Sequence, residues 1–152
     1  MRSPSLRRSR ADLMKVRVNS RTRHYRTVSF DARRNEVVLI EQRKLPHVFE
    51  LTRTKNFQQT ARAITNMTVR GAGAIGATAG YGLAQRARAF SGKTPAAFER
   101  HVQRVYQTLA EARPTAVDLV NALNDVRAAM DAGESIAQKQ RLALEAAVKF
   151  AD

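Results

Sequence analysis

The sequence predicts an α+β fold that is mainly α, with a small N-terminal antiparallel β-meander followed by a bundle of about five helices. Between residues 25 and 52, apolar and polar residues alternate in short segments separated by turn-forming residues, which is typical of antiparallel strands. From residue 56 onwards, apolar residues recur at intervals of three and four, which is typical of amphipathic helices. A chain of 152 residues can bury the core of one such domain.

Basic residues are concentrated near the N-terminus. Residues 1–34 contain 11 Lys and Arg against 2 acidic residues, whereas residues 35–152 contain 16 against 11. Residues 1–23 are also rich in Ser and poor in apolar periodicity, so we expect a basic, disordered arm there and the folded domain at residues 24–152. The arm lacks the apolar region of a secretory signal, but it could be an organellar transit peptide, and Met14 could be the true start.

Three strands are expected in the meander. Residues 25–30 predict the first, residues 31–35 a turn, and residues 36–41 the second. Pro46 interrupts the pattern, and residues 47–52 predict the third strand.

The first three expected helices have clear start signals. Asn56 can cap a helix over residues 57–69, and the glycine-rich segment predicts a helix over residues 72–90. Thr94 followed by Pro95 predicts the start of the third, because proline is favoured at the first helical position.

Two more helices are expected towards the C-terminus. Thr115 and Asp118 resemble a capping box for the fourth, and Ser135 can cap the fifth. The periodic pattern is still running at residues 150–152, without a stop signal, so we expect this chain to be the N-terminal part of a longer protein.

The glycine-rich segment is the main candidate for a binding site. Arg70 precedes Gly71, Ala72 and Gly73, and bare backbone beside a cation at a helix start suits an anion such as a phosphate. Residues 51–98 contain seven basic residues and no acidic one, which favours anions. The structural alternative is a helix of small residues packed tightly in the core.

Arg113 is a second candidate. It lies just before the expected fourth helix, where a guanidinium could reach a phosphate held at the glycine turn. The alternative is an ordinary surface arginine in a loop.

Several other kinds of site are excluded or disfavoured. Gly71, Gly73 and Gly76 spell a dinucleotide-binding motif, but no strand precedes them and no carboxylate lies about 20 residues later. The apolar run between Arg70 and Arg86 is too short to span a membrane. The sequence has no cysteine, and its three histidines are scattered, so we expect no metal site. The basic arm offers no aromatic stacking partners, so we expect no nucleic-acid partner either.

Five blocks of this sequence, in order, resemble the methylthioribose-1-phosphate isomerases. These blocks are Tyr25-Arg-Thr-Val, Val38-Leu-Ile-Glu-Gln-Arg-Lys-Leu-Pro, Val69-Arg-Gly-Ala-Gly-Ala-Ile-Gly, Ala79-Gly-Tyr-Gly and Arg113-Pro-Thr-Ala-Val. The isomerases share a superfamily with ribose-1,5-bisphosphate isomerases and with the α, β and δ regulatory subunits of the translation-initiation guanine-nucleotide exchange factor.

The resemblance implies that Arg70, Gly71, Ala72 and Arg113 help hold a sugar phosphate. It implies a cytoplasmic, homodimeric enzyme that converts an aldose 1-phosphate to the corresponding ketose in methionine salvage without an organic cofactor. The family's catalytic cysteine and aspartate lie in a following Rossmann-like domain, which this sequence lacks. We therefore expect no catalytic residue in this chain and no activity from it alone.

Two related functions remain as alternatives. Gly73 replaces a proline typical of the methylthioribose enzymes, which resembles the ribose-1,5-bisphosphate isomerase branch. A noncatalytic regulatory module, similar to the exchange-factor subunits, would use the same pocket to sense sugar phosphates or nucleotides. A nucleic-acid binder is a third class, which steep salt dependence of binding would reveal.

Overall fold

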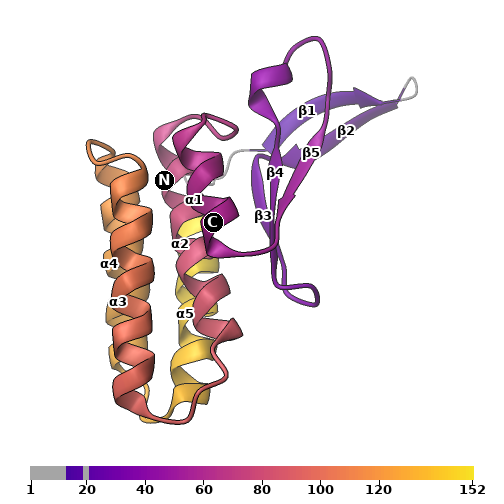
Figure 1. The fold of residues 1–152 in the computed structure, drawn as a ribbon. Coiled ribbons are helices and arrows are strands. Elements are labelled where there is room, and N and C mark those ends of the chain that lie inside the picture. The colour runs from indigo at the N-terminus through magenta and orange to yellow at the C-terminus, as the bar shows by residue number, and fades with distance from the viewer. Residues whose placement is uncertain (1–12, 19–20) are drawn as a thin grey trace, which may run out of the picture.

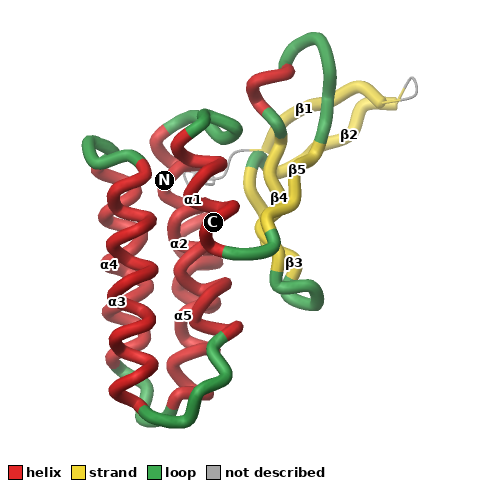
Figure 2. The backbone as a smooth tube through the Cα atoms, viewed as in Figure 1, coloured by secondary structure: helices red, strands yellow, loops and turns green. Residues whose placement is uncertain are grey.

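The computed structural model describes residues 13–18 and 21–152. Its strands lie to one side of a bundle of five helices (Figure 1). The expected α+β, mainly α class is therefore confirmed, and the helices account for most of the chain (Figure 2).

The expected three-stranded meander is present. Strands β3 (Val28–Asp31), β4 (Glu36–Ile40) and β5 (Leu51–Thr54) pair antiparallel in that order. Val28, Val37 and Leu39 are fully buried and belong to the main core. The sheet therefore contributes one wall to the core that it shares with the helices.

The first and third strands of the meander differ in their bounds from the expectation. Residues 25–30 do not form one strand, because Thr27 separates β2 from β3. The third strand begins at Leu51 rather than at residue 47, because Gln42–Lys44 form a short 3-10 helix and the chain then turns. Val48 in this turn is 51% exposed, so its apolar character does not mark a buried strand.

A further hairpin precedes the sheet. Strands β1 (Leu13–Val18) and β2 (Arg21–Arg26) pair antiparallel, so the expected boundary between arm and domain at residue 23 falls inside β2. Apolar and basic residues alternate along β1, a period-two pattern that the density of basic residues obscured. The first twelve residues of the expected arm lie outside the described part of the chain.

The helices are α1 (Phe57–Thr65), α2 (Ala72–Ala89), α3 (Pro95–Ala112), α4 (Val117–Asp131) and α5 (Ile136–Ala151). None of the helices in the described part is long and apolar enough to cross a membrane. Helix α2 packs against each of the other four, so it forms the centre of the bundle.

Helix α1 is four residues shorter than expected. The Asn66 side chain accepts hydrogen bonds from the backbone N–H and the hydroxyl of Thr68, at 3.0 and 2.7 Å. Met67 between them has a φ of 68°, which a right-handed helix cannot contain. This local turn ends the helix.

Three expected N-caps are confirmed. The side chains of Asn56, Thr94 and Ser135 each accept a hydrogen bond from a backbone N–H in the first turn of α1, α3 and α5. The expected capping box of α4 is wrong, because its N-cap is Ala116 and no side chain caps it. Helix α2 has no side-chain cap either.

The small residues of α2 allow close packing. A Cβ at Gly76 would lie 2.8 Å from the backbone oxygen of Asp118 in α4 and 2.8 Å from the Phe150 ring in α5. Every residue from Ala74 to Gln85 is buried. The core-packing interpretation of the glycine-rich segment therefore holds for the middle of α2.

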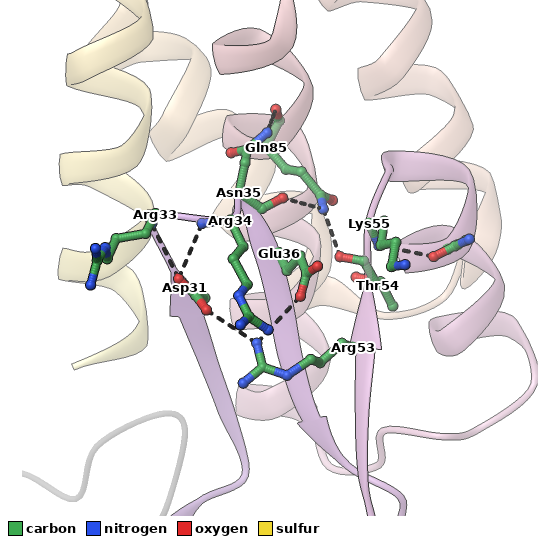
Figure 3. Close-up of polar contacts among 10 residues, drawn as sticks. Asp31, Arg33, Arg34, Asn35, Glu36, Arg53, Thr54, Lys55 and Gln85 are labelled. Carbon is green, nitrogen blue, oxygen red and sulfur yellow. Dashed lines mark hydrogen bonds and ion pairs between the residues drawn. The ribbon is translucent and has the colours of Figure 1, made fainter.

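A buried polar network joins the sheet to α2 (Figure 3). The Gln85 side chain, which is 1% exposed, donates to the backbone oxygens of Asn35 at 3.0 Å and Thr54 at 2.8 Å. It accepts a hydrogen bond from the Thr60 hydroxyl at 2.9 Å, and the Asn35 side chain donates to the Gln85 backbone oxygen. Helix α2 thus has one fixed position against the β3–β4 turn.

Candidate anion-binding site

Helix α2 begins at a glycine with an unusual backbone conformation. Gly71 is the N-cap, with a φ of 92° and a ψ of 135°, a region that L-residues with a side chain rarely adopt. The first helical hydrogen bond runs from the N–H of Ile75 to the Gly71 oxygen at 2.8 Å. The backbone N–H groups of the three residues before Ile75 therefore have no partner within the helix.

A cavity of about 200 Å³ lies at this helix start. Its lining residues are Thr27, Gln42, Arg70, Gly71, Ala72, Gly73 and Ala74. The sheet side contributes the first two, and the start of α2 with the residue before it contributes the rest. The cavity is smaller than the range of about 300–1,000 Å³ typical of drug-sized ligands, so it suits a small group such as a phosphate.

The charge around the cavity favours an anion. Arg70 is exposed and forms no ion pair with a carboxylate among the described residues. The first turn of α2 contains no acidic residue. Free N–H groups and the positive end of the helix dipole together make a helix start an anion site.

Arg113 lies outside this cavity. It is the half-buried C-cap of α3, just before α4. The Thr65 hydroxyl at the end of α1 donates to the backbone oxygen of Ala112 at 3.4 Å, so Arg113 is at the bundle end where α1 stops. Only six residues separate the end of α1 from the start of α2, so both arginines belong to this end of the bundle.

The uncapped start of α4 belongs to the same end. Asp118, in its first turn, lies against Gly76, while Ala122 and Val126 lie against Gly80, so α2 and α4 run parallel. Asp118 supplies a carboxylate here, whereas Arg113 supplies a guanidinium.

The two sheet residues of the cavity were not predicted from the sequence. Thr27 and Gln42 are separated from Arg70 by 43 and 28 residues. A hydrogen bond from the Gln42 N–H to the Thr68 oxygen, at 3.0 Å, joins the end of the sheet to the loop before α2. The sequence did contain one signal for Gln42, because this residue begins residues 42–46, which resemble the isomerases.

Glu41 holds this junction in place. Its carboxylate is nearly buried and accepts hydrogen bonds from the Arg43 backbone N–H at 3.1 Å and from the Arg43 guanidinium at 2.8 and 2.9 Å. The bond from the Arg43 side chain is the main reason that the pKa of Glu41 lies below its usual range. Glu41 also caps the 3-10 helix that Gln42 begins.

A metal centre has no support in the described residues. No group of three or more His, Asp or Glu side chains there could hold a metal ion, and the sequence contains no cysteine. The candidate site therefore consists of backbone N–H donors, Arg70 and the polar residues from the sheet side.

The small sheet, the helical bundle and the glycine start of α2 define a class of proteins with known members. The sequence profile of the initiation factor 2 subunit family matches residues 68–152, more than half of the chain. The chain belongs to this family.

The proteins to which this chain is similar include isomerases. It is 36% identical over 129 residues to methylthioribose-1-phosphate isomerase 1 of Pseudothermotoga lettingae, and the match covers 85% of this chain and 37% of the relative. It is 39% identical over 130 residues to methylthioribose-1-phosphate isomerase of Methylorubrum extorquens, covering 86% of this chain and 34% of the relative. The chain thus spans little more than a third of these curated relatives.

Solved structures agree with the sequence comparison. The crystal structure of 5-methylthioribose 1-phosphate isomerase from Pyrococcus horikoshii superposes with a TM-score of 0.78 at 38% identity, covering 83% of this chain and 35% of that one. Subunit delta of translation initiation factor eIF-2B from A. fulgidus superposes with a TM-score of 0.75 at 33% identity, covering 82% of this chain and 36% of that one.

Proposed function

We propose that this chain is the N-terminal, phosphate-binding portion of an isomerase that converts 5-methylthioribose 1-phosphate to 5-methylthioribulose 1-phosphate in methionine salvage. The observation that carries the proposal is the cavity at Gly71, which is lined by Arg70 and by the start of α2 with its unpaired backbone N–H groups. The relatives named as methylthioribose-1-phosphate isomerases support this substrate.

In this proposal, Arg70 and the start of α2 hold the phosphate, and Arg113 contributes charge from the same end of the bundle. The chain binds and orients the substrate but does not move its protons, because the sequence has no cysteine to serve the role implied by the resemblance. The active protein would be a cytoplasmic homodimer in which a further Rossmann-like domain, after residues 24–152, completes the site.

Binding of sugar phosphates tests the proposal. We expect titration calorimetry or NMR to show saturable binding of 5-methylthioribose 1-phosphate to the chain. Arg70→Ala should weaken it at least about tenfold, because a charge-assisted hydrogen bond is lost. Arg62→Ala is the matched control, since Arg62 is exposed on α1 and does not line the cavity. Equal weakening by both substitutions, or isomerisation by the chain alone, would contradict the proposal.

A second function is a noncatalytic regulatory module that senses sugar phosphates or nucleotides. Its support is the superposition on the eIF-2B delta subunit. Ribose 1,5-bisphosphate and adenosine monophosphate, titrated in parallel, distinguish the candidates. Preference for the bisphosphate would favour the ribose-1,5-bisphosphate isomerase branch, and preference for the nucleotide would favour the regulatory module.

A further inference from the structure

The two walls of the cavity at Gly71 differ in their chemistry. The α2 wall carries backbone N–H groups that have no partner within the helix, and Arg70 beside them has a guanidinium that only donates hydrogen bonds. Such a wall suits phosphate oxygens, which accept hydrogen bonds. The sheet wall contributes Gln42, and the side-chain amide of this residue both donates and accepts hydrogen bonds.

The Gln42 amide is available to a ligand. Its residue is half-buried, and the amide makes no hydrogen bond within the part of the chain that the structure describes. An amide without a protein partner bonds to water or to a ligand, and Gln42 is one of the residues that line the cavity.

The backbone that carries Gln42 is fixed on both sides. Its N–H donates to the Thr68 oxygen at 3.0 Å, and its own oxygen accepts from the Leu45 N–H at 3.3 Å. The preceding Glu41 carboxylate is held by Arg43, so the 3-10 helix has a capped start. The Gln42 amide is therefore presented from a pre-formed support, as a selective contact requires.

We propose that the Gln42 side-chain amide binds a hydroxyl group of the ligand's sugar and thereby makes the cavity at Gly71 select sugar phosphates over simple phosphates. This inference rests on the proposed function, because it takes the ligand's phosphate to lie at the start of α2. A sugar hydroxyl can donate to Oε1 and accept from Nε2, whereas a phosphate dianion offers no proton to Oε1. The volume of about 200 Å³ suits a phosphate with its neighbouring carbon atoms.

Gln42→Met tests this selectivity, because methionine keeps the length of the side chain and removes both polar groups. We expect the affinity for 5-methylthioribose 1-phosphate to fall about three- to tenfold, the effect of one or two neutral hydrogen bonds. The affinities for inorganic phosphate and methyl phosphate should change by less than about twofold. Gln58→Met, at an exposed position of α1 outside the cavity, is the control and should change none of the three.

The amide can also be observed directly in the wild-type chain by ¹⁵N NMR. Its side-chain NH₂ resonances, assigned by their loss in Gln42→Met, should shift saturably with 5-methylthioribose 1-phosphate and much less with methyl phosphate. A merely structural glutamine would show the same response to both.

The outcomes separate the two proposals. No saturable binding of any phosphate compound to the wild-type chain would overturn both. Binding that is lost in Arg70→Ala but unchanged in Gln42→Met would overturn the role of Gln42 alone. An equal loss of affinity for all three compounds in Gln42→Met would also overturn the role of Gln42. The residue would then support the phosphate site without binding the sugar.

Discussion

Glycine is required at the start of α2 and in its middle for different physical reasons. At Gly71 an added Cβ would meet no atom within 4 Å, but the φ of 92° disfavours any side chain. At Gly76 the backbone is helical and the limit is space, since Cβ would lie 2.8 Å from a backbone oxygen. At Gly80 the nearest atoms are at 3.7–3.8 Å, an ordinary contact distance. Glycine is therefore needed at Gly71, in the candidate site, for its backbone conformation. At Gly76, in the core, it is needed because there is no space for a side chain.

Alanine substitutions at Gly76 and Gly80 should act in opposite directions. Gly76→Ala should lower the free energy of unfolding by about 1–3 kcal/mol, because overpacking shifts α4 or α5. Gly80→Ala should leave it unchanged or raise it by up to about 1 kcal/mol, because alanine favours the helix and fits the space. Urea denaturation of both variants measures this, and a more stable Gly76→Ala would contradict the packing seen here.

At the scale of elements, α2 and α3 are joined by a contact that depends on protonation. The Arg86 Nε–H donates to Nε2 of His101 at 2.5 Å, and the His101 ring also lies against Phe90. Burial, followed by the positive charges of Arg86 and Arg104, holds the pKa of His101 below its usual value. Nε2 accepts a hydrogen bond only in the neutral imidazole, so protonation removes this contact.

The stability of the fold should therefore depend on pH through His101. A histidine with a lowered pKa in the folded state contributes stability that is present above its unfolded pKa of about 6.5 and is lost as the pH falls below it. We expect the urea midpoint of the wild type to fall between about pH 7 and pH 5. His101→Gln, which cannot be protonated in this range, should reduce that slope. An identical pH profile in both proteins would show that His101 does not contribute.

At the scale of the whole molecule, the position of the sheet on the bundle shapes the cavity. One wall of the cavity belongs to the sheet side and the other to α2, so their relative placement sets its width. Gln85 bonds the β3–β4 turn, and the Thr68 oxygen accepts from Gln42 near the other end of the sheet. Both contacts join segments that are distant in sequence.

Removal of the Gln85 amide should destabilise the whole domain. In Gln85→Leu the backbone oxygens of Asn35 and Thr54 lose a buried donor, so we expect a loss of about 2–4 kcal/mol in the free energy of unfolding. Gln58→Leu, at an exposed position of α1, should change it by less than about 0.5 kcal/mol. Equal unfolding free energies of the two variants would show that the network does not hold the sheet to α2.

Local sequence patterns predicted all five helices and three of their starts, but not the end of α1, the cap of α4 or all the strands. The starts of α1, α3 and α5 were predictable because each capping side chain bonds to a backbone N–H three residues away. The strands around Thr27 and Leu51 were misplaced because the alternation of apolar and polar residues does not show where pairing with the neighbouring strand ends. The β1–β2 hairpin was missed because its basic residues suggested an arm.

The residues that line the candidate site also fall into two groups, those that the sequence predicted and those that it did not. Arg70, Gly71 and Ala72 are consecutive, so a single stretch of sequence identified the donor wall of the cavity. Thr27 and Gln42 reach it only through the packing of the sheet against α2, and Arg113 stays outside it although it belongs to the same end of the bundle. Capping and periodicity act over a few residues and can be read from the chain, whereas a cavity has walls from distant segments and exists only once the core has brought them together.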